Sequence, residues 1–484
     1  MTLPTIPHLQ HFPRNRRWQA HWIWQGAATA NAHRLVRRVF HLDRVGAELR
    51  LLVSAAAHYR LYVNGSWMAD GPVPSAAHHQ YYDIHDCAAM LQPGDNCIAA
   101  IVWTGHEGPA GFLAELLDGE RSPLGSDGSW RCWDPAAWRP DSHAAKGNVL
   151  HPYQEQLDAR RLPVGWTMPA WPDADLPRAQ IIAGRLGDRP PQVWPWQNLL
   201  PADIPALAYT AVQATAVVAE EECLSLANRW RPQDLSISLS QCGSALRHAR
   251  IEQAASLCSS AADCTLQRAL PRYRSADTAA WDPCLLLDFG RILTAHIELE
   301  VDAEEGAVLE IGSAERLIDG HFNNAIECPF AESYTTRSGA QSWRSLAWRS
   351  FRYLRIRLRD GNGPMRIRAL HALRVRSPLE DVGAFASSDD RLCAVERISR
   401  ETIRLCSVAA LMDTPHRESA QWLGDVAAVT VPGLHACFGD THLAGKFLRQ
   451  AAMNSTPGGL LCNLSNNEPR AGEWTIPDYS LWWL

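Results

Sequence analysis

The feature that most constrains this chain is a succession of short apolar or alternating runs with turn residues between them. Residues 48–53 have strand length, and Asn64-Gly65, after a second such run, supplies the two positive-φ residues of a type I′ hairpin. The pattern returns at 295–311 and at 365–375, again with glycine in the turns. No long helical period interrupts these runs, which predicts antiparallel β-sandwich or jelly-roll domains.

The pattern changes at Ser387-Ser-Asp-Asp390. Ser388 or a neighbour can cap a helix, and the acidic residues suit the positive end of its dipole. Apolar residues at helical spacing follow, and helix and loop patterns alternate from there on. A β, β, α order is that of separate domains along one chain, and 484 residues predict about three units of roughly 150 residues each.

The domain prediction follows these changes of pattern. We expect an N-terminal β-sandwich or jelly roll, a connecting region packed on it, a second β-sandwich and a helical domain, over 1–125, 126–207, 208–383 and 384–484 respectively. The connecting region is rich in Pro and Trp, and prolines such as those in 189–196 exclude a central strand or a helix interior. The predicted fold class is therefore multidomain β + α.

One strand of the second predicted sandwich carries arginine at alternate positions from 355 to 359. In 352–359, Leu354, Ile356 and Leu358 lie on one face and arginines on the other. Such a face is more often a solvated sheet surface than an anion site, so we interpret it as exposed to water.

Composition and charge exclude several classes of partner. Lys and Arg number 46 against 52 Asp and Glu, which gives a net charge of −6, and no basic stripe runs along the chain. We therefore expect no nucleic-acid partner. No stretch of about 18 apolar residues is present, so we expect no membrane partner.

Cysteine and histidine usage bears on compartment and cofactors. The 13 cysteines are odd in number and never spaced Cys-x-x-Cys, which favours a reducing compartment. Residues 1–24 lack the apolar core of a signal peptide, so we expect a cytoplasmic protein. No His-Cys cluster has ligand spacing and no Gly-rich phosphate loop follows a strand, so we expect neither a metal nor an organic cofactor.

A candidate site lies in residues 413–425, where three carboxylates, an arginine and a tryptophan gather. Thr414-Pro415 looks like an N-cap and a first helical residue. In a helix that starts there, Glu418, Trp422 and Asp425 would lie on one face, because they are spaced i, i+4 and i+7. This face fits two interpretations: a solvated charged stripe, or a site that uses the tryptophan and the carboxylate before the helix.

The same residues decide whether Glu418 could act as an acid. A glycosidase acid must be protonated near neutral pH, so its pKa must be raised. Asp413, Asp425 and burial against the tryptophan would raise the pKa of Glu418. The helix N-terminus and Arg417 would lower it. The sequence leaves this balance open.

The segment Asp413-Thr-Pro-His-Arg-Glu-Ser-Ala-Gln-Trp-Leu-Gly-Asp425 resembles the signature of inverting bacterial α-L-rhamnosidases with an (α/α)6 barrel, glycoside hydrolase family 78. Thr414, Ser419 and Gln421 stand where that family usually has Cys, Arg and Gly. Further motifs similar to the family's sandwich domains are Asn64-Gly65 with Asp70-Gly-Pro72, Glu155-Gln-Leu-Asp-Ala-Arg160 with Gly165-Trp166, Asp288-Phe-Gly290, Ala314-Glu315 and Ser350-Phe-Arg-Tyr353. The likeness covers most of the chain.

The resemblance implies a role for each residue of the cluster. Glu418 would be the general acid. The residues that would bind the substrate are Asp413, Arg417, Trp422, Asp425 and Trp474. The substrate would be a rhamnose-containing glycoside or oligosaccharide, and a homo-oligomer is left open. Residues 384–484 would be the start of a six-hairpin (α/α)6 barrel.

An inverting glycosidase also needs a second carboxylate, about 6.5–9.5 Å from the acid, to activate water. In the family that base lies late in the barrel, which needs roughly 200 residues where 384–484 supplies 101. We therefore expect a truncated barrel without its base, which leaves the activity of this chain open. Glu468 and Glu473 are the candidates to stand in for the base.

Two alternatives to an α-L-rhamnosidase stay open. One is another (α/α)6-barrel glycosidase with the same placement of the acid, which a substrate panel separates. The other is a non-catalytic carbohydrate-binding protein whose β-sandwiches recognise the sugar. The 20 tryptophans fit such recognition, because flat rings stack on sugar C–H faces, but they equally fit sandwich cores.

Overall fold

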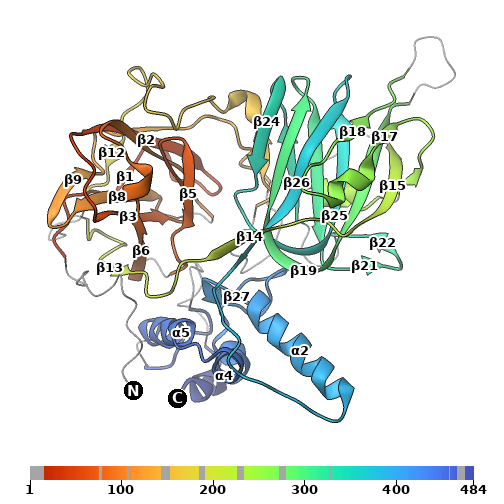
Figure 1. Ribbon diagram of the computed structural model, residues 1–484. Helices are drawn as coiled ribbons and strands as arrows, with labels where there is room; N and C mark the ends of the chain where they lie inside the picture. Colours follow the sequence, from red (N-terminus) through yellow and green to blue (C-terminus); the bar gives the residue numbers. More distant parts are fainter. Residues whose placement is uncertain are drawn as a thin grey trace.

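The computed structural model describes residues 16–75, 79–105, 108–142, 153–184, 191–225, 234–241, 243–271, 279–325, 330–456, 458–465 and 475–484. Two sheet-rich parts stand side by side, and the C-terminal helices lie below both of them in the view of Figure 1. The predicted fold class, two β domains followed by helices, is therefore confirmed.

The N-terminal part is a sandwich of two sheets. One has the order β12–β1–β8–β3–β6–β13 with β9 beside β8, and the other the order β10–β2–β7–β4–β5. The strands are β1 (Ile23–Trp24), β2 (His33–Leu42), β3 (Leu49–Ala56), β4 (His58–Val63), β5 (Ser66–Gly71), β6 (His79–Asp86), β7 (Gly94–Trp103), β8 (Gly111–Asp118), β9 (Arg121–Gly125), β10 (Arg131–Trp133), β12 (Gln180–Ile181) and β13 (Asn198–Pro201). Inward-facing residues of both sheets, such as Val53, Leu61 and Phe112, form the core between them.

The hairpin at Asn64-Gly65 is confirmed. β4 and β5 pair antiparallel, and Asn64 and Gly65 have φ angles of 50° and 85°. These are the two positive values that a type I′ turn requires. The Asn64 side chain also donates to the Met90 carbonyl at 2.9 Å, which ties the turn to the short 3₁₀ helix η2 (Ala88–Met90).

The second part is a single curled sheet. Within the described ranges it comprises β11 (Gln156–Asp158), β14 (Ala208–Val212), β15 (Ala216–Leu224), β16 (Ser244–Ala245), β17 (Arg250–Glu252), β18 (Cys264–Gln267), β19 (Trp281–Ala303), β20 (Val308–Ala314), β23 (Ala331–Thr335), β24 (Gly339–Arg344), β25 (Arg349–Asp360) and β26 (Met365–Arg376). The long strand β19 changes neighbours: residues 284–288 lie between β15 and β25, whereas 298–302 lie between β24 and β26. The register shifts near Gly290, whose φ is +76°, and the sheet thereby curls around one core.

Two pairings in the described part of the chain are parallel, which differs from the antiparallel sheets that we expected. β13 pairs with β6, and β11 pairs with β23. Both strands come from the Pro-rich region between residues 126 and 207, which also supplies β10 and β12, so this region contributes strands to both sandwiches. Parallel pairing is possible because a long connection, unlike a tight hairpin, lets a strand return in either direction. The domain boundaries at 125, 207 and 383 stay predictions.

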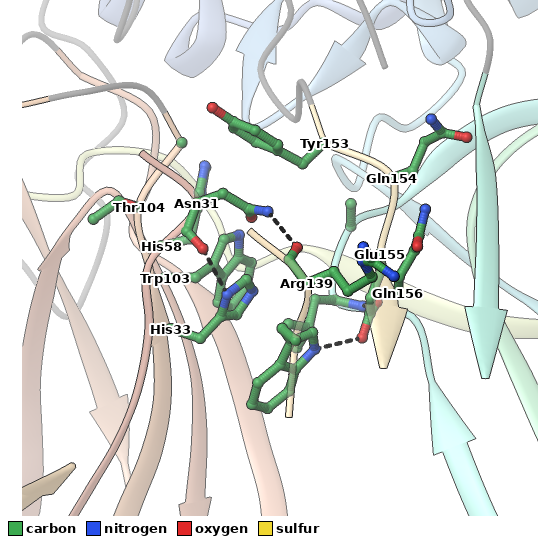
Figure 2. A pocket seen from close by; sticks show the side chains of 14 residues that line it. Asn31, His33, His58, Trp103, Thr104, Arg139, Tyr153, Gln154, Glu155 and Gln156 are labelled. Atoms are coloured by element: carbon green, nitrogen blue, oxygen red, sulfur yellow. Dashed lines mark hydrogen bonds between the residues drawn. The ribbon is translucent and has the colours of Figure 1, made fainter. Parts of the chain in front are cut away.

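Glu155, within this connection, joins it to the second sandwich. Its carboxylate accepts hydrogen bonds from the indoles of Trp138 at 3.1 Å and Trp343 at 3.3 Å, and from the Leu346 amide at 2.6 Å. Burial raises the pKa of Glu155, and these three donors oppose the shift. A pocket of about 30 Å³ lies beside it, between the two sandwiches, with His58 and Tyr153 in its wall (Figure 2).

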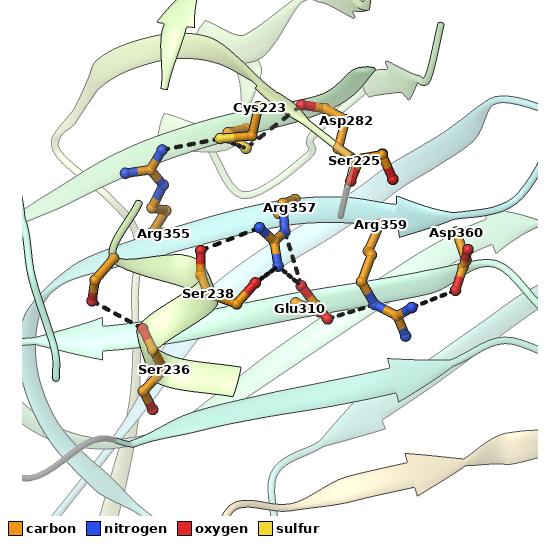
Figure 3. A network of polar contacts seen from close by, with 12 residues as sticks. Cys223, Ser225, Ser236, Ser238, Asp282, Glu310, Arg355, Arg357, Arg359 and Asp360 are labelled. Carbon is orange, nitrogen blue, oxygen red and sulfur yellow. Dashed lines mark hydrogen bonds and ion pairs between the residues drawn. The ribbon is translucent and has the colours of Figure 1, made fainter. Parts of the chain in front are cut away.

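The arginine face of β25 is buried, so our interpretation of it as a solvated surface is wrong. Arg357 donates to Glu310 of β20 at 2.9 Å and to the Ser238 hydroxyl at 2.6 Å (Figure 3). Arg355 donates to Glu221 at 2.9 Å. Both arginines are 4% exposed. The physical reason is the short helix α1 (Leu235–Leu239), which packs its leucines over this face and closes it from water.

The C-terminal part is helical. Its elements are α2 (Asp390–Leu405), β27 (Ser407–Val408), β28 (Ala410–Leu411), α3 (Leu423–Asp425), the π-helical turn η6 (Val426–Thr430), α4 (Val431–Phe438), α5 (His442–Met453) and α6 (Pro477–Trp483). Asp389 caps α2 through the Arg391 amide, as the cap signal at 387–390 predicts. The remaining short elements, all in the sheet-rich parts, are η3 (Ala159–Arg161), η5 (Ala254–Cys258), β21 (Leu317–Ile318) and β22 (His321–Phe322).

One face of α2 is apolar and open to water. Leu392, Val395 and Ile398 are 50%, 59% and 67% exposed, and α2 has no buried residue. α6 likewise exposes Leu481 and Trp482. A soluble monomer rarely leaves so contiguous a stripe uncovered, so this face is suited to packing against further structure.

Candidate active site

The cluster predicted from the sequence lies on a turn and not on a helix, so the predicted helix from Thr414 is wrong. Residues 415–418 form turns, and helical geometry begins only at Leu423, with Trp422 in the N-cap position. Ser419 has a φ of 57°, in the left-handed region that ends a helix.

The turn is closed by its own backbone. The Asp413 amide donates to the Ala420 carbonyl at 2.9 Å, and the Ser419 amide donates to the Thr414 carbonyl at 2.9 Å. The loop therefore folds back on itself, and Glu418 faces Asp413 across it.

Four of the predicted site residues meet within this loop. The Asp413 and Glu418 carboxyls share a hydrogen bond, and the Trp422 indole N–H donates to Glu418 Oε2 at 2.8 Å. Arg417 Nη2 lies 3.4 Å from Glu418 Oε1 and 3.9 Å from Asp413 Oδ2. Asp413 is more enclosed than Glu418, with side chains 11% and 25% exposed, so the pair opens to the surface on the glutamate side.

The other two predicted residues are placed differently. Asp425 is the last residue of α3, is exposed, and accepts a hydrogen bond from the Tyr479 hydroxyl of α6 at 3.3 Å. Trp474 lies outside the described residues, as do Glu468 and Glu473, the candidates for the base.

The carboxyl pair carries a shifted pKa. Burial, and then the negative charge of Glu418, raise the pKa of Asp413 to about 7, while the amides of Thr414 and Ala420 oppose the shift. Two carboxyls so close cannot both ionise without cost, so the pair retains a proton near neutral pH. An enclosed pair that holds one proton is suited to general acid catalysis.

The second sandwich supports the loop from one side. His416 is 9% exposed; its Nδ1 lies 3.2 Å from the Ser350 carbonyl, and its ring meets the Phe330 ring edge-on at 5.7 Å. The Ser350 hydroxyl in turn donates to Glu315. Our sequence analysis did not assign His416 a role, although it lies inside the 413–425 motif and Glu315 and Ser350 lie in motifs already noted.

Gln421 fastens the loop to the helices. Its side-chain amide donates to Gln450 of α5 at 3.0 Å and to Ser465 at 2.7 Å, and its carbonyl oxygen accepts the Leu411 amide at 3.1 Å. Gln421 stands where the family usually has glycine, and it is 1% exposed. Its buried hydrogen bonds hold the loop against the helices.

The described residues include neither a metal-binding cluster nor a membrane-spanning helix. No group of three or more His, Cys, Asp or Glu side chains there could hold a metal ion. No helix in the same ranges is long and apolar enough to cross a membrane.

The fold, and the second sandwich in particular, are similar to those of known proteins. Residues 280–374, most of the second sandwich, match the family model described as the bacterial alpha-L-rhamnosidase concanavalin-like domain. The resemblance to bacterial α-L-rhamnosidases of glycoside hydrolase family 78 is therefore confirmed.

Particular relatives support this resemblance. An alpha-L-rhamnosidase of Formosa agariphila is 26% identical over 155 residues, which are 30% of this chain and 16% of that protein. The GH78 rhamnosidase of Bacillus sp. GL1 superposes with a TM-score of 0.78 at 19% identity, over 97% of this chain and 66% of that one. The Streptomyces avermitilis α-L-rhamnosidase, solved with L-rhamnose, has a TM-score of 0.62 at 17% identity, over 90% of this chain and 37% of that one. The chain thus spans less than two thirds of each of these relatives.

Proposed function

We propose that this chain supplies the general acid and the sugar-binding residues of an inverting α-L-rhamnosidase. Such an enzyme releases terminal α-L-rhamnose from a rhamnose-containing glycoside. The observation that carries the proposal is the hydrogen-bonded carboxyl pair of Asp413 and Glu418, with the Trp422 N–H on the glutamate. The rhamnosidase domain at 280–374 and the structural relative that holds L-rhamnose support the choice of sugar.

In the proposed reaction, Glu418 gives its proton to the glycosidic oxygen as the bond from C1 to that oxygen breaks. Water attacks C1 from the opposite face, and a base takes the proton that the water loses, which inverts the anomeric centre. Glu418 is the more exposed member of the pair and so the one within reach of a substrate. Asp413 helps to keep a proton on the pair, and its oxygens, with Arg417 and Asp425, bind sugar hydroxyls.

The base is expected from a longer form of the protein. The exposed apolar stripe of α2 and the exposed Leu481 and Trp482 of α6 support further helices that pack on them. The same helices would bring the second carboxylate opposite Glu418. Glu468 and Glu473 remain the candidates for a base within this chain.

The test is hydrolysis of an aryl α-L-rhamnoside by this chain and by a form that carries additional downstream sequence. We expect turnover by the longer form, with inversion at C1 followed by NMR. Turnover by this chain alone would assign the base to Glu468 or Glu473, which substitution of each by Gln then separates. No turnover by either form would contradict the proposal.

The two alternatives give different results. Another (α/α)6-barrel glycosidase would hydrolyse other aryl glycosides in a panel and leave the rhamnoside intact. A non-catalytic carbohydrate-binding protein would hydrolyse none of them, and its sugar binding would survive Glu418→Gln and Asp425→Asn.

A further inference from the structure

A pocket of about 340 Å³ lies where the two sandwiches and the helical part meet. Its walls come from β5 and the residues after it (67–74), from the connection at 202–209, and from His296, Trp348 and Ala409. None of residues 413–425 lines it. The pocket is therefore separate from the candidate active site.

Aromatic side chains form part of the wall, and Trp67 is held in place by several contacts. The Trp67 ring carries the Arg344 guanidinium at 4.1 Å from its centroid and meets the Tyr209 ring edge-on at 5.0 Å. Its indole N–H donates to Asp70 at 2.9 Å. Trp103 and Trp348 add further ring surface to the wall. Fixed rings of this kind offer apolar faces to a ligand at little entropic cost.

One carboxylate of the wall is already neutralised. Asp70 accepts two hydrogen bonds from Arg60, at 2.9 and 2.7 Å, and lies 3.6 Å from His296. The Arg60 ion pair and the Trp67 bond hold the pKa of Asp70 below its usual value against the effect of burial. Burial lowers the pKa of His296 to about 4, so this imidazole is neutral at pH 7.

The second carboxylate of the wall, Asp83, can accept further hydrogen bonds from a ligand. It is 8% exposed; its Oδ2 accepts the Tyr59 hydroxyl at 2.5 Å, and its Oδ1 accepts the Val73 amide at 3.4 Å. The Val73 contact is long, and an ionised carboxylate oxygen can accept two bonds. The Tyr59 hydroxyl also lies 2.8 Å from His85 Nε2, so the tyrosine is fixed between two polar groups of the wall.

We propose that this pocket binds a neutral, hydroxylated ring of monosaccharide size, with its hydroxyls on Asp83 and its C–H faces on the aromatic wall. The volume falls at the small end of the range for ligand pockets, about 300–1,000 Å³. Rings beside hydrogen-bond acceptors suit a molecule that has both C–H faces and hydroxyl groups. The charges of Asp70 and Arg60 in the wall cancel each other, so Asp70 offers little attraction to an organic cation. This favours a neutral ligand.

This site would bind sugar whether or not Glu418 catalyses hydrolysis. The ligand could be a free monosaccharide or one ring of a longer glycan, and both present the same chemistry. Binding of L-rhamnose, D-glucose and a rhamnose-containing oligosaccharide to the whole 484-residue chain, measured by calorimetry and by saturation-transfer NMR, distinguishes the two sources. Choline serves as the cationic probe.

Two substitutions localise the binding. Ala206 lines the pocket and is exposed, so Ala206→Trp should fill the entrance without disturbing the core. Ala211 is exposed on β14 and outside the pocket, so Ala211→Trp is the matched control. Asp83→Asn removes the carboxylate and keeps the shape, and we expect it to weaken binding by about tenfold or more.

We expect a sugar-binding event that Ala206→Trp and Asp83→Asn abolish or weaken, and that Ala211→Trp leaves unchanged. Thermal melting of each variant checks that it folds. Sugar binding unaffected by Ala206→Trp, choline bound more tightly than any sugar, or no sugar bound at all would overturn the proposal. None of these outcomes depends on hydrolysis, so failure here and failure of the proposed function are distinguishable.

Discussion

The indole N–H of Trp422 donates to Glu418 Oε2 at 2.8 Å across a turn in which neither residue is helical. The two residues are four apart, the spacing of neighbours on a helix face, yet Ser419 between them has a left-handed φ of 57°. The hydrogen bond fixes the plane of the Glu418 carboxyl, which leaves Oε1 toward Arg417.

If a longer form turns over the rhamnoside, Glu418→Gln in that form should lower turnover by about 10²–10⁴-fold, the usual contribution of acid catalysis. The loss should shrink for nitrophenyl rhamnosides, because a good leaving group hardly needs a proton. kcat for a series of aryl rhamnosides with leaving groups of different pKa measures this. An equal loss across the series would make Glu418 a sugar ligand and not the acid.

Trp422→Phe keeps an aromatic ring and removes the N–H that orients Glu418. We expect kcat to fall by about tenfold, the value of one hydrogen bond to a charged group, with KM little changed. A rise in KM at constant kcat would mean that the indole binds the sugar and does not position the acid. Steady-state kinetics on the longer form separates the two results.

Asp413 should make stability depend on pH. Its pKa is raised from 3.8 to about 7 in the folded chain, so the folded state holds a proton that the unfolded state releases. Its contribution is therefore fully present below about pH 4 and is lost as pH rises through about 7. Asp413→Asn should remove this part of the pH dependence of the unfolding free energy in urea. Asp43→Asn, whose side chain is fully exposed, is the control and should leave the dependence unchanged.

Glu310→Ala should strongly destabilise the second sandwich. It leaves Arg357 buried without its ionic partner, which costs about 3–5 kcal/mol in comparable pairs. Asp263→Ala breaks the exposed pair with Arg366 on the same sheet and should cost far less. Urea unfolding of both variants gives the comparison, and equal losses would mean that water reaches Arg357.

The exposed face of α2 should matter only in the longer form. Ile398→Ser should leave this chain's unfolding free energy nearly unchanged, because Ile398 is 67% exposed. In the longer form the same change should cost about 1.5–3 kcal/mol if further helices bury the side chain. Chemical unfolding of the two forms decides this, and an equal effect in both would leave the face uncovered.

Local chemistry made several features predictable from the sequence. The turn at Asn64-Gly65 requires positive φ at two successive residues, and few residue pairs accept that conformation. The start of α2 needs only a side chain that accepts the Arg391 amide, and Asp389 provides it within the predicted cap. Because all the partners are within a few residues, the rest of the fold has little influence on either feature.

The sequence by itself thus determined the β, β, α order and identified four residues that meet in one turn, Asp413, Arg417, Glu418 and Trp422. Only the tertiary structure decided its shape: His416 contacts the second sandwich and Gln421 contacts α5, and these distant partners hold a turn where local signals favour a helix. Likewise, alternation in β25 separated its two faces, but the burial of Arg357 depended on α1, more than a hundred residues away. Periodicity reports which side chains share a face, whereas burial is set by what packs on that face, and that requires contacts that no local pattern encodes.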